Sequence, residues 1–166
     1  MMKWYVLHVM TGEESTVKDK LHRDLPDINT LVPRQKIIER HRGILREVVR
    51  ILFPSYVFVK MKLDEKNYYA ARGIPGVFNF LGTTRPAAVP DNQMANVLRW
   101  CGDKELIGLS RVEIGKEIKV IAGPLLGMEG QIIRIDKRKG RAKVRVDLFR
   151  EAKVIDLGVE FIQASE

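Results

Sequence analysis

A run of positive side chains between residues 136 and 146 is the part of the sequence best suited to binding a charged partner. Arg141, Lys143 and Arg145 alternate there with small apolar residues. Side chains two apart on a strand share a face, so we expect these cations to emerge together, opposite the core. Such a surface binds phosphates through counterion release, with an affinity that falls steeply as salt rises. The pattern therefore predicts binding to RNA or DNA.

Further cations before and after this strand extend the predicted surface. The candidate RNA-binding set is Lys137, Arg138, Lys139, Arg141, Lys143, Arg145, Arg150 and Lys153. The alternative is a solubilising strand edge, because exposed lysines also protect edges from aggregation. We favour binding, since the mutual repulsion of cations packed on one hairpin makes them a costly route to solubility.

A second candidate surface is aromatic and apolar. Its members lie near the start of the chain and around a strongly apolar segment at 56–61: Trp4, Tyr5, Phe53, Pro54, Tyr56 and Phe58. An aromatic cluster is commonly part of a core. If one face of the sheet has no covering helix, however, the same side chains form a docking surface for a partner helix. The residues alone leave both readings open.

The sequence contains no arrangement typical of an enzyme. It lacks a G-x-S-x-G elbow, a phosphate-binding G-x-x-x-x-G-K-[ST] loop, an H-E-x-x-H motif and a dinucleotide fingerprint. Cys101 is the only cysteine and the three histidines are scattered, so one chain cannot assemble a disulfide framework or a Cys/His zinc cluster. We therefore expect a non-enzymatic protein without metal or cofactor.

Composition places the chain among globular proteins with polyanionic partners. Its 166 residues, 45% hydrophobic and 30% charged, allow one domain or two small ones. The net charge of +8 favours nucleic acid or an acidic protein as a partner. No apolar run reaches the roughly 18 residues that span a bilayer, and the first residues lack the layout of a signal peptide. We expect a cytoplasmic protein with no membrane partner.

The first hundred residues are predicted to form a split βαβ unit, in which helices cover a mostly antiparallel sheet. The elements between residues 3 and 101 are expected in the order β-α-β-β-β-α-β-α. Lys3 to Met10 suits the first strand. Thr11 and Glu14 then have the spacing of a capping box, in which each side chain binds a backbone amide of the first helical turn, and Pro26 ends that helix.

Two strands are expected between Leu31 and Leu52, joined by a charged, mobile tip at residues 41–43. Tyr56 to Met61 is nearly continuous in apolar β-formers and is predicted to be the central strand. The remaining elements are a helix capped by Asp64, a strand over Val77 to Leu81, and a helix capped by Asp91 that ends at Cys101.

The pattern changes after residue 101. Residues 102–111 hold two glycines and little periodicity, which predicts a short, flexible linker. From Val112 onward, short β runs alternate with Gly- and Pro-rich turns and predict a small all-β barrel of four or five strands. The runs are Lys116 to Ala122, Gly130 to Asp136, Arg141 to Asp147 and Ala152 to Leu157. The expected domains are therefore residues 1–101 and 112–166.

Four segments of the chain resemble the NusG family of transcription elongation factors. Three are similar to the family's N-terminal NGN domain: WYVLHVMTGEE at 4–14, LFPSYVFVKM at 52–61 and IPGVFNFLG at 74–82. The fourth, GKEIKVIAGPLLGMEGQIIRID at 115–136, is similar to its KOW motif. Because all four occur in the family's order, the resemblance covers nearly the whole chain. It implies an α+β NGN domain followed by an SH3-like KOW barrel.

The resemblance also implies partners for the two candidate surfaces. It describes a non-enzymatic factor, here expected as a monomer, whose NGN domain docks on the clamp helices of RNA polymerase through aromatic and apolar side chains. This favours docking over burial for at least part of the aromatic cluster. In the family the N-terminal helix faces the upstream non-template DNA, so Lys20 and Arg23 are the candidates for phosphate contacts with that strand.

Two departures from the housekeeping pattern point to a specialised member of the family. The linker is short, and the F-G-R that usually follows the last KOW strands stands here as Leu148-Phe149-Arg150. Together with the cationic hairpin, these features resemble the LoaP subgroup, antiterminators of long biosynthetic operons, which implies a leader RNA as the KOW ligand. One alternative is a housekeeping factor whose KOW domain binds a ribosomal protein or a termination factor. Another is a ribosomal or RNA-packaging module that uses both domains on RNA.

A third branch of the family, the RfaH type, has a KOW domain that folds as a helical hairpin. Five glycine and proline positions in the C-terminal segment, together with dense Val and Ile, disfavour such helices: Gly123, Pro124, Gly127, Gly130 and Gly140. We therefore predict a constitutive barrel.

Overall fold

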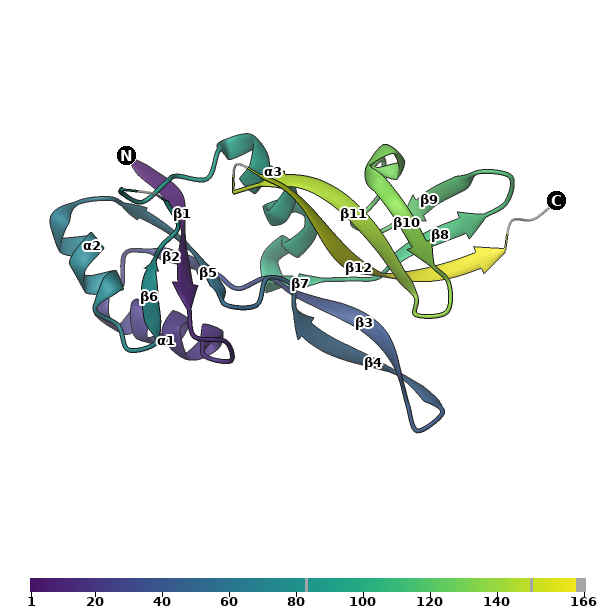
Figure 1. The fold of residues 1–166 in the computed structure, drawn as a ribbon, viewed down its shortest axis with the longest axis horizontal. Coiled ribbons are helices and arrows are strands. Elements are labelled where there is room, and N and C mark those ends of the chain that lie inside the picture. Colours follow the sequence, from purple (N-terminus) through teal and green to yellow (C-terminus); the bar gives the residue numbers. More distant parts are fainter. Residues whose placement is uncertain (83, 150, 164–166) are drawn as a thin grey trace. The chain divides into compact units, whose positions relative to one another are not determined.

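The structure, a computed structural model, divides into two compact units that each draw on two separate stretches of the chain (Figure 1). It describes residues 1–82, 84–149 and 151–163. Unit 1 comprises Met1–Val32 and Phe53–Asn96, and unit 2 comprises Pro33–Leu52 and Val97–Glu166. Among the described residues, no helix is long and apolar enough to cross a membrane.

Unit 1 is built on a four-stranded antiparallel sheet with the strand order β2-β5-β1-β6. Its strands are β1 (Met2–Val9), β2 (Asn29–Leu31), β5 (Tyr56–Lys62) and β6 (Val77–Phe80), and its helices are α1 (Glu14–Asp24), α2 (Glu65–Arg72) and the first half of α3 (Asp91–Cys101). The predicted split βαβ arrangement is confirmed, and β5 lies inside the sheet as expected. The short strand β2 was not predicted.

The centre of the unit 1 sheet is covered on both faces. Val57, Phe58 and Val59 are consecutive on β5 and all have no exposed surface. Because successive strand residues point to opposite faces, full burial of three in a row requires cover on both sides. On α1, Val17 and Leu21 are also fully buried, so this helix packs on the sheet through one apolar face.

The capping box predicted for α1 is wrong. The helix begins at Glu14, and its N-cap residue Glu13 makes no capping hydrogen bond with its side chain. Gly12, at a φ of +92°, turns the chain before the helix begins, so Thr11 lies outside it and pairs its hydroxyl with that of Ser55. The backbone N–H of Gly12 donates to Glu14 Oε1 at 2.7 Å. The buried Glu14 carboxylate therefore fixes the turn that enters the helix.

The caps predicted for the two later helices have different outcomes. The cap of α2 is confirmed, because the backbone N–H of Asn67 donates to Asp64 Oδ1 at 2.8 Å. Asp91, in contrast, is the first residue of α3 and not the residue before it. The carbonyl of Pro90 accepts from the backbone N–H groups of Gln93 and Met94, so the chain turns into the helix one residue earlier than predicted.

Unit 2 contains a five-stranded sheet with the order β10-β11-β12-β8-β9. Its strands are β8 (Ser110–Ile114), β9 (Ile118–Ala122), β10 (Ile132–Asp136), β11 (Arg141–Leu148) and β12 (Glu151–Gln163). The long β12 pairs antiparallel with β11 and then parallel with β8. In the described part of residues 105–163 the only helical segment is a 3-10 turn at Glu129–Gln131, so the all-β prediction for the C-terminal region is confirmed.

Unit 2 also contains a smaller sheet formed by β3 (Arg34–His41), β4 (Ile44–Ile51) and β7 (Leu106–Ile107). β3 and β4 form the predicted hairpin around Arg42 and Gly43. Both turn residues have positive φ, +52° and +81°. This is the backbone conformation of the type I′ turns that match the twist of a two-residue hairpin.

Much of the segment predicted as a flexible linker has regular structure. Gly102–Lys104 forms a 3-10 turn, and β7 pairs in parallel with the start of β3. Ile107 is 1% exposed, so burial of its side chain anchors the segment. The first residues of β8 also lie in the predicted linker. The sequence did not predict this structure, because a single apolar anchor leaves no periodic pattern.

The hairpin packs on β12 through a buried amide. Gln35 Nε2 donates to the carbonyl of Asp156 at 2.8 Å, and the backbone N–H of Gly158 donates to Gln35 Oε1 at 3.2 Å. A Cβ atom on Gly158 would lie 2.5 Å from the carbonyl oxygen of Lys36, so only glycine permits this approach. The hairpin therefore belongs to the same compact unit as β8–β12, whereas the sequence grouped it with residues 1–101. Polymerase docking by residues 1–101 and RNA binding by residues 112–166 remain predictions.

Candidate nucleic-acid and protein interfaces

The alternation predicted along β11 is present in the structure. Ala142 and Val144 are fully buried and Val146 nearly so, while Arg141 and Lys143 are half-buried and Arg145 is exposed. The three cations therefore share the face opposite the buried residues, as the register requires.

Two of these three cations are engaged within the protein. Arg141 Nη1 donates to the carbonyl oxygens of Ile38 at 2.9 Å and Lys139 at 2.8 Å, and Nη2 lies 4.0 Å from Glu39 Oε1. Its side chain is only 17% exposed. The expectation of Arg141 as an open phosphate-binding cation is therefore corrected: its guanidinium joins β11 to β3. Lys143 Nζ lies 3.4 Å from Asp156 Oδ1, which leaves Arg145 as the most open of the three.

The turn between β10 and β11 presents three more of the predicted cations to solvent. Lys137, Arg138 and Lys139 are all exposed. Asp136 Oδ1 accepts a hydrogen bond from the backbone N–H of Lys139 at 3.0 Å, and this bond fixes the turn. Among the described residues, none of these three cations forms an ion pair with a carboxylate. Their positive charge is therefore available to a ligand.

Lys153, another member of the predicted RNA-binding set, lies on β12 opposite Val146 of β11. The ammonium of Lys153 is 5.1 Å from the ring centroid of Phe149, within range of a cation–π interaction. Arg150 lies outside the described residues.

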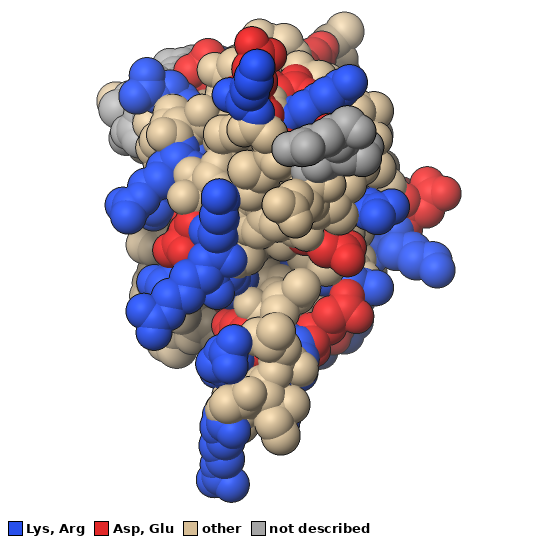
Figure 2. Space-filling model, turned by 90° about the vertical axis from the view of Figure 1, so that its right-hand side faces the viewer, with Lys and Arg blue, Asp and Glu red and all other residues tan. Residues whose placement is uncertain are grey.

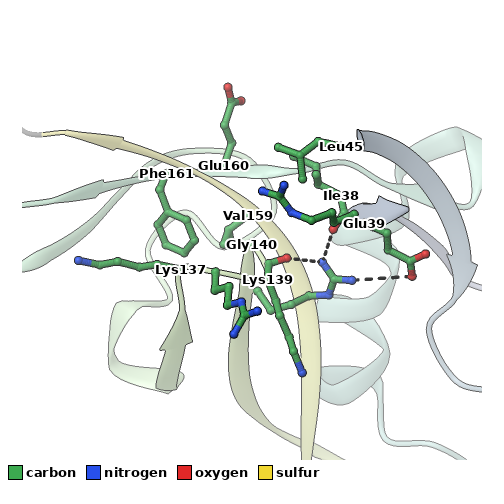
Figure 3. A pocket seen from close by; sticks show the side chains of 12 residues that line it. Ile38, Glu39, Leu45, Lys137, Lys139, Gly140, Val159, Glu160 and Phe161 are labelled. Atoms are coloured by element: carbon green, nitrogen blue, oxygen red, sulfur yellow. Dashed lines mark hydrogen bonds and ion pairs between the residues drawn. The ribbon is translucent and has the colours of Figure 1, made fainter. Parts of the chain in front are cut away.

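A groove of about 680 Å³ lies between the β3–β4 hairpin and the β10–β11 turn. Figure 3 shows Ile38, Glu39 and Leu45 of the hairpin along one side and Lys137 and Phe161 along the other, with dashed lines for the hydrogen bonds and ion pair between residues of the lining. Five cations line it against two carboxylates: Arg40, Lys137, Arg138, Lys139 and Arg141 against Glu39 and Glu160. In Figure 2, Lys and Arg side chains gather on one flank and at the lower end, where the hairpin lies in Figure 1.

Sequence reasoning found the turn cations of this groove but not Arg40 or Phe161. The charged hairpin tip predicted at residues 41–43 lies next to Arg40 in the sequence and could have indicated that residue. Nothing in the sequence pairs residues 34–41 with residues 156–161, because that contact depends on the long-range packing of β3 on β12.

The predicted aromatic cluster divides into buried and surface members. Tyr5, Phe53 and Phe58 are 6%, 5% and 0% exposed, and the rings of Phe53 and Phe58 contact each other with centroids 5.7 Å apart. These three belong to the core of unit 1, since β5 is covered on both faces. The structure thus limits the surface part to Trp4 and Tyr56, which are half-buried, and Pro54, which is exposed.

Two side chains that the sequence did not single out extend this surface. The ring of His8 lies 5.8 Å from that of Tyr56 and 5.2 Å from that of Phe78. Phe78 is 54% exposed. An exposed phenylalanine next to the ring of His8 offers an apolar contact for a partner. The pairing of His8 with Tyr56 follows from the sheet order, which one sequence does not reveal.

The candidate DNA-contacting residues lie on α1. Lys20 is half-buried. The side chain of Arg23 is 71% exposed and its Nε lies 3.1 Å from Asp24 Oδ1. An exposed pair of this kind contributes little to stability, so its arginine is available to a phosphate.

Burial shifts the pKa of two side chains, Cys101 and Tyr5. Burial, and secondarily the charge of Glu105, raises the pKa of the Cys101 thiol to about 12, so the thiol stays protonated and unreactive. Burial also raises the pKa of Tyr5, against the opposing charge of Arg85. Across residues 1–82, 84–149 and 151–163, no three His, Cys, Asp or Glu side chains gather as metal ligands would.

The fold and the two surfaces define an α+β protein in which an NGN-type sheet precedes an all-β KOW region. Residues 2–98 match the family model described as transcription termination factor nusG, and residues 114–147 match the KOW motif. The chain belongs to the NusG family of transcription termination/antitermination proteins.

Individual relatives match along nearly the whole chain. The transcription termination/antitermination protein NusG of Rickettsia bellii is 30% identical over 99% of this chain and 90% of its own length. The protein of the same name from Yersinia pestis is 32% identical over 93% of this chain and 92% of its own. A solved structure of Thermotoga maritima NusG, 27% identical, matches with a TM-score of 0.61 and covers 95% of this chain and 94% of the other.

Proposed function

We propose that this chain is a processive antiterminator of the LoaP-like type, which docks on RNA polymerase through unit 1 and binds a leader RNA through unit 2. The names of its relatives, transcription termination/antitermination proteins, support the general role. The observation that carries the RNA half of the proposal is the groove of unit 2, where five cations face two carboxylates. A polyanion is the ligand that this charge balance favours.

The polymerase contact is assigned to the surface aromatic group of unit 1. Trp4, Pro54 and Tyr56 come from the sequence prediction, and His8 and Phe78 join them on the sheet. A helix of the polymerase clamp that packs on these rings would bury apolar surface now exposed to water. Phe53 and Phe58 are buried in the core of unit 1 and are not assigned to this contact.

The polymerase contact is tested with two substitutions of surface aromatics. Phe78→Ala and Tyr56→Ala should each weaken retention of the protein on immobilised RNA polymerase, because each removes part of the docking surface. Tyr69→Ala is the matched control, since Tyr69 is 62% exposed on α2 and lies outside this group. Equal retention of all three variants would refute the assignment and favour a module that acts on RNA alone.

Lys20 and Arg23 are proposed to contact non-template DNA beside the polymerase. Basic side chains on one helix flank bind phosphates and orient the protein without reading bases. Replacing both with Ala should weaken crosslinking to upstream DNA in an elongation complex while leaving polymerase retention intact.

The RNA contact is tested with the full chain and its candidate leader transcript. A specific site predicts binding well above that of a scrambled RNA, with an affinity that falls as salt rises. Replacement of Lys137 and Lys139 together should lower the affinity. Equal binding of leader and scrambled RNA would contradict a specialised RNA-binding role.

A housekeeping factor with a protein-binding KOW domain is the second candidate. It is favoured by exposed apolar side chains on unit 2, namely Ile118, Ile121, Leu126 and Ile133, which are 36–56% exposed. Exposed apolar side chains of this kind suit a protein partner better than a phosphate chain. Retention of a ribosomal protein or a termination factor that survives loss of the cationic residues would favour this alternative.

A further inference from the structure

We infer that the groove between the β3–β4 hairpin and the β10–β11 turn binds a single-stranded stretch of RNA, with the hairpin forming one of its two sides. This inference rests on the proposed RNA-binding function and identifies the part of the RNA that is bound. It moves the site from the open face of β11 into the groove. It also adds Arg40 and Phe161 to the binding residues.

The two sides of the groove are joined before any ligand binds. The guanidinium of Arg141 links β11 to the carbonyl of Ile38 on β3, and Gln35 links β3 to β12 through the two hydrogen bonds described above. A preformed groove reduces the conformational entropy lost on binding. Arg141 is therefore a positioning residue, since its donors are used within the protein.

The charge of the groove suits a phosphate chain. Arg40 is exposed on the hairpin side, and Lys137, Arg138 and Lys139 are exposed on the turn side. Of the two lining carboxylates, Glu39 is already paired with Arg50 at 3.0 Å. The cations on both sides thus outnumber the opposing charge, as binding along a backbone of phosphates requires.

The apolar lining of the groove selects unpaired nucleotides. Phe161 is a half-buried aromatic side chain in the lining, and Leu45 is 58% exposed on the hairpin side. A base stacks on an aromatic ring only when its face is free, which the bases of a duplex do not offer. A groove of about 680 Å³ is also far larger than a single bound ion needs.

The inference is tested by fluorescence anisotropy with the full chain and a labelled oligouridine RNA of about 12 nucleotides. Arg40→Ala should weaken binding several-fold and lower the slope of log affinity against log salt by about 0.7, because one phosphate contact is lost. Phe161→Ala should weaken binding roughly fivefold or more with the slope unchanged, since stacking involves no counterion. If Phe161→Ala does not fold, Phe161→Leu keeps an apolar side chain and still removes the stacking ring.

Two matched variants control for charge alone. Arg46→Ala removes an exposed cation from the same hairpin but outside the groove lining, and Arg134→Ala removes an exposed cation from β10, also outside the lining. Both should bind oligouridine within about twofold of the unmodified chain, because neither contacts the groove.

Different results would show that the groove is the wrong binding site and that the chain does not bind RNA at all. If the unmodified chain binds oligouridine and Arg145→Ala weakens it while Arg40→Ala and Phe161→Ala do not, RNA binding stands and the groove is the wrong site. Tighter binding of an RNA duplex, or of oligothymidine DNA, would also overturn the inference. If the chain binds neither oligouridine nor its leader transcript, the proposed RNA-binding function itself fails.

Discussion

The guanidinium of Arg141 on β11 donates a hydrogen bond of 2.9 Å to the carbonyl oxygen of Ile38 on β3. The two residues are more than a hundred positions apart in the sequence. This bond joins the hairpin to the five-stranded sheet and fixes one end of the basic groove. Arg141, a cation of the predicted RNA-binding strand, therefore has a structural role.

Arg141→Ala should destabilise the protein by about 1–2 kcal/mol, because the carbonyls of Ile38 and Lys139 lose their charged donor. Urea unfolding of the full chain measures this change. Arg145→Ala on the same strand is the control and should stay within about 0.5 kcal/mol, since its side chain is exposed. Arg141→Lys should not restore stability, because an ammonium cannot reproduce the planar fork that reaches two carbonyls. Equal stability of all three variants would show that the hairpin does not depend on this residue.

Gly158→Ala should destabilise unit 2 by about 1–3 kcal/mol, because the added methyl group meets the carbonyl of Lys36 at 2.5 Å and the side chain of Leu109 at 2.8 Å. The melting temperature of the full chain reports the loss. Gly130→Ala is the matched control, since no atom lies within 4 Å of its added Cβ and its φ is not positive. A melting temperature unchanged by Gly158→Ala would mean that β3 does not pack this closely on β12.

Cys101 should resist alkylation in the folded protein. Its pKa is raised to about 12 by burial, so the folded state holds about a thousandfold less thiolate than an unfolded chain near pH 8. Because the folded protein keeps the thiol proton to a higher pH than the unfolded chain does, the contribution of this group to the free energy of unfolding is fully present below the ordinary thiol pKa. It is lost as the pH rises toward 12. Iodoacetamide labelling followed by mass spectrometry should therefore be slow in buffer and fast in denaturant. Rapid labelling in buffer at pH 8 would contradict the burial of this thiol.

The local elements could be predicted from the sequence because each has a local cause. Apolar β-formers specify β5, Asp64 caps α2 through its own side chain, and Arg42-Gly43 supplies the two positive φ values of the hairpin turn. The capping box failed because Gly12 turns the chain between Thr11 and Glu14. Spacing alone does not reveal such a turn.

The composition of the sites could be predicted in part, but their assembly could not. Alternation correctly placed Arg141, Lys143 and Arg145 on one face of β11. Whether a cation on that face is open depends on what packs against it, and β3 packs against Arg141. Likewise, Phe58 and Tyr56 share a strand face, yet one is fully buried and the other half-buried. Which of the two rings is buried depends on the segments from elsewhere in the chain that pack over them.

Phe58→Ala should therefore behave differently from Phe78→Ala. Removal of the fully buried ring leaves a cavity and should cost about 3–5 kcal/mol. Phe78 is 54% exposed, so its removal should change stability by less than about 1 kcal/mol while weakening polymerase retention. Chemical unfolding and polymerase retention of both variants separate core from surface. A folded Phe58→Ala protein of unchanged stability would contradict the placement of that ring.

Single-round transcription through a terminator tests whether the chain acts as an antiterminator through both proposed contacts. The template carries the leader of the operon that holds the gene, and purified RNA polymerase transcribes it with the unmodified chain, with Phe78→Ala or with Arg40→Ala. The unmodified chain should raise readthrough, and each variant should lose most of this effect, since one lacks the polymerase contact and the other the RNA contact. Readthrough that is the same with and without the unmodified chain would contradict the proposed antiterminator function.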